Sequence, residues 1–175
     1  MPSRSFIYIL GCLLLCVPVS GQSPNPYASL LFDKLVMYAY NGADKGAPIV
    51  NQQGELDTTV IKQAMIDPRT AKRLNSRLGD IKSFGSIAAA CFEPHLGFVY
   101  YRKGKAVAHL DICLACNRLR SSLRIKAQEQ GRHGTGRDVY YQLDGMSPAF
   151  RQFLNGLLIR YHFSDPLKAG VNRPN

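Results

Sequence analysis

The sequence predicts an α+β domain. An antiparallel sheet, centred on a hairpin over about residues 96–113, packs against helices over about residues 68–78 and 148–161. The hairpin is indicated by an aromatic, branched run that is followed by alternating apolar and polar side chains. Each helix is indicated by an N-cap residue and a proline, Asp67-Pro68 in the first and Ser147-Pro148 in the second.

The central hairpin has a definite expected register. Residues 96–101 (LGFVYY) form the first strand, Lys103-Gly104-Lys105 is a turn signal, and residues 106–113 alternate between two faces. Burying the apolar faces together leaves residues 103–105 as a three-residue loop. The expected pairs are Leu96 with Ile112, Phe98 with Leu110, and Tyr100 with Ala108.

The elements before the hairpin follow from shorter signals. Residues 35–40 are expected to form a strand, because Asn41-Gly42 ends them with a turn dipeptide. Residues 49–61 suggest a short hairpin or an extended segment. The helix over 68–78 carries one apolar stripe, and Gly79 ends it. The stripe consists of Ala71, Leu74 and Leu78.

The elements after residue 85 are predicted in the same way. Residues 86–92 read as a strand of small residues, and residues 118–126 add a further strand. The polar, glycine-rich residues 128–136 are expected to form a mobile loop, and residues 139–143 a short strand. The last helix has a nearly complete apolar stripe. Its members are Phe150, Phe153, Leu154, Leu157, Leu158 and Tyr161.

The N-terminus indicates export. Residues 1–21 resemble a secretory signal peptide, with a charged start at Arg4 and an apolar run too short to span a bilayer. We expect residues 22–175 to form a single globular domain with frayed ends, periplasmic or secreted, with no membrane span after cleavage. The alternative is a lipoprotein anchored at Cys12, over which simple cleavage is favoured.

The charge distribution is strongly basic. The chain has a formal net charge of +10, and residues 102–137 hold nine Lys and Arg against Asp111 and Glu129. For an exported protein this favours anionic envelope components as partners, and no nucleic acid is expected. The alternative is a solvated basic face without a partner.

Three cysteines remain after cleavage, and the hairpin gathers them with a histidine. The register places His95 opposite Cys113, while Cys91 lies four residues before His95 and Cys116 three after Cys113. Three thiolates and one imidazole match a structural zinc site, for which Cys-x2-Cys is a common half-site. The sequence thus predicts a zinc site in a domain that is not expected to be an enzyme. Its ligands would be Cys91, His95, Cys113 and Cys116.

Other chemistry fits the same residues. An odd number of cysteines in an exported protein also suggests one disulfide and one leftover thiol. Cys113 and Cys116 could form a redox pair, or act as thiol nucleophiles with His95 lowering a thiol pKa. Plain buried thiols are a further alternative. No haem is expected, because Asn117 stands where c-type attachment requires histidine.

The residues around the cluster also carry a resemblance. Residues 90–101 (ACFEPHLGFVYY) and 112–117 (ICLACN), followed by Leu119 and Ser121-Ser122, resemble an uncharacterised family of small exported bacterial proteins. That family shares a CFxPHxGxVxY…ICxxCN core followed by a C-terminal helix. The resemblance covers the middle third of the chain well and the rest weakly. It implies export and a shared fold, and no mechanism.

Overall fold

A computed structural model describes residues 25–41, 46–137, 140–143 and 145–163. The predicted signal peptide over residues 1–21, Cys12 and the tail from residue 164 lie outside the described residues. The predictions of cleavage, of lipid anchoring and of a frayed C-terminus therefore stay predictions.

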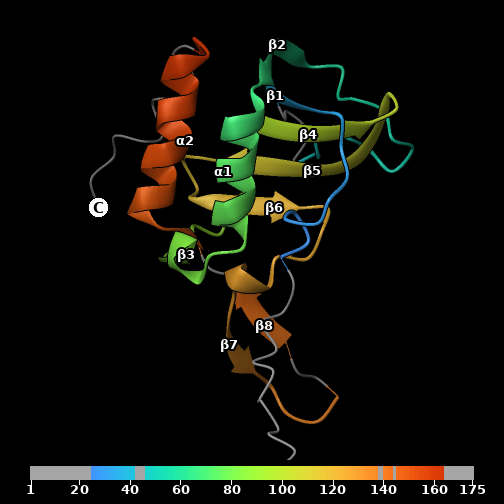
Figure 1. The fold of residues 1–175 in the computed structure, drawn as a ribbon. Coiled ribbons are helices and arrows are strands. Elements are labelled where there is room, and N and C mark those ends of the chain that lie inside the picture. The colour runs from blue at the N-terminus through green and yellow to red at the C-terminus, as the bar shows by residue number, and fades with distance from the viewer. Residues whose placement is uncertain (1–24, 42–45, 138–139, 144, 164–175) are drawn as a thin grey trace, which may run out of the picture.

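The fold is α+β, as predicted, and is built on a five-stranded antiparallel sheet of order β2-β1-β4-β5-β6 (Figure 1). A two-stranded sheet joins β3 to β9, and a β7–β8 hairpin extends away from the main sheet (Figure 1). The strands are β1 Lys34–Tyr40, β2 Val60–Ile66, β3 Phe84–Ser86, β4 Leu96–Arg102, β5 Lys105–Cys113, β6 Arg118–Ser121, β7 Glu129–His133, β8 Tyr140–Leu143 and β9 Gly145–Met146. The helices are α1 Pro68–Leu78 and α2 Pro148–Arg160, with short 3₁₀ turns at Ile81–Ser83 and Lys126–Gln128.

Both α-helices lie on one side of the sheet, where they bury the main core (Figure 1). Alternate side chains of β1, β4 and β5 point to this side, as the two-residue period of a strand requires. The helices contribute the apolar stripes that the sequence predicted. The principal members of this core are Leu35, Met37, Phe98, Tyr100, Leu110 and Ile112 from the sheet, and Leu74, Leu78, Phe150, Leu154 and Leu158 from the helices.

The helices begin where their capping residues place them. The Asp67 Oδ1 atom accepts a hydrogen bond from the Thr70 N–H at 3.0 Å. The Ser147 Oγ atom accepts one from the Phe150 N–H at 3.3 Å. In both helices the proline at the first position lacks the N–H that would otherwise need a partner, so the local sequence alone determines where the helix starts.

Removing the serine cap should weaken α2 measurably. Ser147 is buried, so in Ser147→Ala the Phe150 N–H loses its side-chain acceptor in a place that water does not reach freely, and it keeps only the weaker capping contact with the Ser147 carbonyl oxygen at 3.0 Å. We expect the free energy of unfolding to fall by about 1 kcal/mol. Urea denaturation followed by far-UV circular dichroism measures the change. Ser147→Asp, which keeps an acceptor, should retain most of the stability, and an equal loss in both variants would contradict the capping role.

The opposite side of the sheet is covered by a segment without regular helices or strands. Residues 46–57 cross it, with a bridge between Val50 and Leu56, and bury a second apolar cluster. Ile49 is fully buried there and lies directly over Gly97 of β4. Because Gly97 has no side chain, the crossing segment approaches the sheet closely. The cluster consists of Val36, Tyr38, Tyr40, Ile49, Val50 and Val99.

A methyl group at Gly97 should therefore destabilise the fold. A Cβ atom at this position would lie 2.9 Å from the Ile49 Cβ and Cγ1 atoms, which is closer than packed carbons approach. We expect Gly97→Ala to lower the free energy of unfolding by about 2 kcal/mol. Gly156→Ala is the matched control, because a Cβ atom there meets nothing within 4 Å and the residue lies in a helix. That control should be neutral or stabilising by about 1 kcal/mol in the same urea titration.

The register of the central hairpin is confirmed, and its turn differs from the prediction. The three predicted pairs are present, but a bulge after Tyr100 shifts the end of the ladder so that Arg102 pairs with Lys105. The loop therefore has two residues, Lys103 and Gly104, both with positive φ. A two-residue turn with two positive φ angles matches the right-handed twist of the strands, whereas a three-residue loop would have kept the ladder regular.

Two further predictions were wrong. Residues 86–92 do not form a strand: β3 ends at Ser86, and the chain from there to residue 95 has no regular structure. Residues 128–136 are not simply a loop, because β7 pairs there with β8, which was predicted as a strand. In both places small or polar residues gave a weak local signal. Pairing with the neighbouring β8 sets the conformation of residues 129–133, whereas hydrogen bonds to the more distant residues 116–118 set that of residues 87–90. The strand β2 also extends further than the predicted segment over residues 49–61.

Candidate functional site

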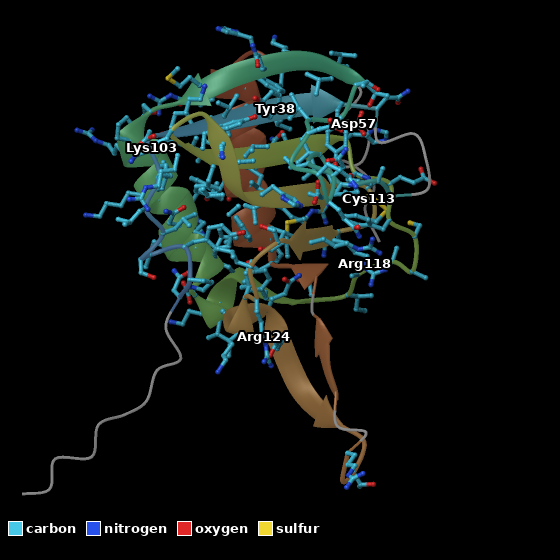
Figure 2. All side chains as sticks on the ribbon, turned by 90° about the vertical axis from the view of Figure 1, so that its right-hand side faces the viewer. Tyr38, Asp57, Lys103, Cys113, Arg118 and Arg124 are labelled. Carbon is cyan, nitrogen blue, oxygen red and sulfur yellow. A yellow bond between two sulfur atoms is a disulfide. The ribbon has the colours of Figure 1, made fainter. Side chains whose placement is uncertain are left out.

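The site lies at the turn between β5 and β6. Cys113 is the last residue of β5, and the chain then turns through residues 114–117 before β6 begins at Arg118, which pairs with Cys113. Cys113 and Cys116 form a disulfide across this turn, with their Cα atoms 5.3 Å apart. Cys113 and Arg118 lie at the end of the sheet opposite the Lys103 turn (Figure 2).

A distant segment is tied to this turn by its backbone. The Ala89 N–H donates to the Cys116 carbonyl oxygen at 2.9 Å. The Asn117 Nδ2 atom donates to the Ile87 carbonyl oxygen at 2.9 Å, and Asn117 itself has a positive φ that reverses the chain. These bonds hold residues 87–91 beside the disulfide in place of the strand pairing that the sequence suggested. They bring Cys91 to the site.

Two arginines of β6 complete the attachment. The Arg118 guanidinium donates to the Ala90 carbonyl oxygen at 2.9 Å. The Arg120 guanidinium lies over the Phe92 ring, 4.0 Å from its centre, where a cation is attracted to the face of the ring. These members of the basic region therefore have a structural role next to Cys91. Binding of anionic envelope components by this region stays a prediction.

The three sulfur atoms are close together but differ in exposure. The Cys91 Sγ atom lies 2.8 Å from the Cys116 Sγ atom. Cys113 and Cys116 are 2% and 3% exposed, whereas Cys91 is exposed and is the free cysteine among the described residues. The Cys116 N–H donates to the Cys113 Sγ atom at 3.1 Å. The arrangement is a buried disulfide with a thiol in contact with one of its sulfurs, so the interpretation as plain buried thiols is wrong.

His95 has a different neighbour from the one predicted. Its N–H extends the hairpin ladder to the Ile112 carbonyl oxygen at 3.2 Å, so the backbone lies where the register placed it. Its ring Nδ1 atom, however, lies 3.3 Å from the Tyr40 carbonyl oxygen on β1. Within the described ranges, no three His, Cys, Asp or Glu side chains are grouped as ligands of one ion. The zinc site with His95 as the fourth ligand stays a prediction.

Asp111 carries a carboxyl group that is buried beside the site. It is 3% exposed, and its Oδ1 atom accepts hydrogen bonds from the Ile49 N–H at 2.6 Å and from the Tyr40 hydroxyl at 3.0 Å. Its Oδ2 atom lies 3.5 Å from the His109 Nε2 atom. Burial raises the pKa of Asp111, and these donors and Arg120 oppose that rise. Burial and the Asp111 carboxylate also raise the pKa of Tyr40, which keeps its hydroxyl protonated as the donor.

From the sequence, His109 and Asp111 are expected to be polar surface residues or a hydrogen-bonded pair, and the surface position is wrong for Asp111. The strand alternation had placed both on the face opposite the main core. That face is buried because residues 46–57 cross it, and the only sequence signal for this was the apolar pair Ile49-Val50. The His109–Asp111 contact agrees with the alternative of an interacting pair.

Neither helix in the described part of the chain has the length and apolar character needed to cross a membrane. A comparison with known proteins found no match among family models, curated proteins or solved structures. The resemblance to a family of exported bacterial proteins therefore stays a prediction.

Proposed function

We propose that the chain is an exported thiol–disulfide exchange protein whose redox-active group is the Cys113–Cys116 disulfide. The observation that carries this proposal is the Cys91 thiol, held 2.8 Å from the Cys116 sulfur. Exchange proceeds by attack of a thiolate on a disulfide sulfur, so a thiol in contact with a disulfide is the arrangement that the reaction needs. In an oxidising compartment outside the cytoplasm, such a disulfide persists between turnovers.

A purely structural role explains the disulfide less well. In the chain-entropy model, a bond that closes a loop of four residues stabilises a fold by about 2 kcal/mol, against about 4.7 kcal/mol for a loop of 100. Here the turn is already held by pairing of Cys113 with Arg118 and by the Asn117 N–H, which donates to the Leu114 carbonyl oxygen at 3.4 Å. The bond therefore adds little constraint that the strands do not supply.

The reaction transfers two electrons and two protons. A substrate dithiol is oxidised to its disulfide, and Cys113 and Cys116 are reduced to two thiols; the reverse direction oxidises the protein at the expense of a substrate disulfide. The co-reactants are thiols and disulfides of exported polypeptides or small molecules, so no further cofactor is required.

The test is a redox titration of the folded chain. After equilibration in buffers with different ratios of reduced to oxidised glutathione, free thiols are alkylated and counted by mass spectrometry. We expect a reversible change between one free thiol and three, with an unchanged far-UV circular dichroism spectrum. A disulfide that is reduced only when the chain unfolds in urea would show that the bond is structural and would overturn the proposal.

The second candidate is the structural zinc site. The observation in its favour is the convergence of three cysteine sulfurs, because thiolates are preferred zinc ligands once the disulfide is reduced. Native mass spectrometry of the exported protein separates the two candidates. A mass higher by one metal ion, with three thiols after denaturation, would establish the metal site and exclude the redox pair. A metal-free protein two hydrogens lighter than the reduced chain, with one free thiol, would exclude zinc.

A further inference from the structure

We propose that Cys91 is the access cysteine of the site, through which every exchange between a substrate and the buried disulfide passes. This inference rests on the proposed function and adds the route. It starts from the difference in exposure. An external thiol must reach a disulfide sulfur to attack it, and Cys113 and Cys116 are almost completely buried with Phe92. Cys91 is exposed and touches Cys116.

The geometry also determines which bond breaks. The Cys91 Sγ atom contacts Cys116, so the attack occurs at the Cys116 sulfur and Cys113 leaves. The Cys113 Sγ atom is the one that accepts a hydrogen bond from the Cys116 N–H, at 3.1 Å. A backbone N–H stabilises a thiolate more than it stabilises a disulfide sulfur, because negative charge develops on the sulfur that accepts the hydrogen bond. The hydrogen bond therefore favours the sulfur that must carry the negative charge.

The position of Cys91 is maintained from both sides. The Ala89 N–H bond to Cys116 and the Arg118 bond to Ala90 precede it in the chain, and the Arg120 contact with Phe92 follows it. All three contacts are made to β6 or to the turn before it, which is the same turn that carries the disulfide. The thiol and the disulfide are thus held to one rigid element, so that they meet without a conformational search.

The complete sequence has three exchanges. In the first, the Cys91 thiolate attacks the Cys116 sulfur; a Cys91–Cys116 bond forms, the Cys113–Cys116 bond breaks, and Cys113 takes up a proton from solvent. In the second, a substrate thiolate attacks the exposed Cys91 sulfur, which releases Cys116 as a thiol and leaves a mixed disulfide on Cys91. In the third, the second thiolate of the substrate attacks the substrate sulfur that is bonded to Cys91, and Cys91 is released as a thiol. The substrate leaves as a disulfide, and Cys113 and Cys116 carry its two electrons.

The test measures how fast dithiothreitol reduces the disulfide in the folded chain. Samples are quenched by alkylation at successive times, and labels on Cys113 and Cys116 are quantified by peptide mapping. In Cys91→Ser, reduction must wait for local opening of residues 87–93, and we expect an about 100-fold lower rate. Ala90→Ser, an exposed neighbour whose backbone bond is retained, should react at the rate of the unaltered chain.

A second measurement traps the intermediates. In Cys113→Ser, Cys91 and Cys116 should form a disulfide, which corresponds to the product of the first exchange. In Cys116→Ser, oxidised glutathione should form a mixed disulfide on Cys91 and not on the buried Cys113. Circular dichroism of each variant checks that the fold is retained.

The outcomes separate the two levels of the proposal. If the disulfide of Cys91→Ser is reduced as fast as in the unaltered chain, or if Cys113→Ser forms no Cys91–Cys116 bond, the access role is wrong while the redox role stands. If the unaltered folded chain does not react with dithiothreitol at all, the redox function itself is wrong.

Discussion

Replacing Asp111 with alanine should lower the free energy of unfolding by about 3 kcal/mol, because two buried donors then lose their acceptor. The Ile49 N–H and the Tyr40 hydroxyl both donate to the Asp111 Oδ1 atom. These two bonds fasten the crossing segment to the sheet, so the loss should be concentrated in residues 46–57. Hydrogen exchange should show faster exchange of the Ile49 amide in Asp111→Ala, and urea denaturation gives the overall change.

Asp111→Asn is the matched control and also carries a prediction about pH. Its amide oxygen can accept both hydrogen bonds, so Asp111→Asn should avoid the loss of stability expected for Asp111→Ala. Because burial raises the native pKa of Asp111, the native state binds the carboxyl proton more tightly than the unfolded state does. The contribution of Asp111 to stability therefore falls as pH rises from the unfolded pKa of about 3.9 through the raised native pKa.

The amide introduced by Asp111→Asn does not titrate, so the variant should gain stability relative to the unaltered chain across that pH window and hold a constant advantage above it. Urea midpoints of both proteins at several pH values between about 3.5 and 8 measure the difference. If Asp111→Asn instead lost stability relative to the unaltered chain as the pH rises, the Ile49 N–H, His109, Tyr40 and Arg120 would together stabilise the carboxylate by more than burial destabilises it.

The second large effect is expected at Asn75 of α1. Its side-chain Nδ2 donates to the Tyr27 carbonyl oxygen at 2.8 Å, and its Oδ1 accepts from the Tyr100 hydroxyl at 2.7 Å. Asn25 in turn donates to the Asn75 carbonyl oxygen at 2.8 Å. One buried amide thus joins the helix, the sheet and the chain before β1. Tyr27 is fully buried, with its hydroxyl in contact with Ser121 of β6.

Asn75→Ala leaves the Tyr27 carbonyl and the Tyr100 hydroxyl without a partner, and should cost about 3 kcal/mol of stability. Limited proteolysis should then cut near Tyr27 faster, because this segment is no longer held to α1. Tyr100→Phe is the control: it removes one member of the network, leaves the Tyr27 bond intact, and should cost about 1 kcal/mol. Equal effects in both variants, with no change in cleavage near Tyr27, would contradict the role of Asn75.

Local sequence signals were sufficient for the helices and the central hairpin. Asp67-Pro68 and Ser147-Pro148 supply the caps within one turn of each helix, so no distant contact is needed to locate the starts. The register of β4 and β5 was predictable for a similar reason. Slipping the hairpin by one residue would turn Phe98 and Leu110 out of the core, so the apolar pattern allows one alignment.

The prediction was wrong where the conformation depends on residues that are distant in sequence. The chain at residues 87–91 satisfies its backbone through Cys116, Asn117 and Arg118, which are far away in sequence, and not through strand pairing. The burial of Asp111 was missed for the same reason, because the segment that covers it lies more than fifty residues earlier in the chain. Neither the bonds of residues 87–91 nor the burial of Asp111 produces a hydrophobic periodicity in the local sequence from which it could be predicted.

Four features follow from caps, side-chain alternation and short spacings, so they can be predicted without any distant contact. They are the α+β class, the helix starts, the hairpin register and the gathering of the three cysteines near one end of the hairpin. Which sulfurs are bonded, and which one is exposed to solvent, depends on tertiary packing. Cys113 and Cys116 are buried and joined because the turn between β5 and β6 packs against Phe92. Cys91 stays exposed because the segment that carries it is fastened to β6 through its backbone, which leaves its thiol at the surface beside the disulfide.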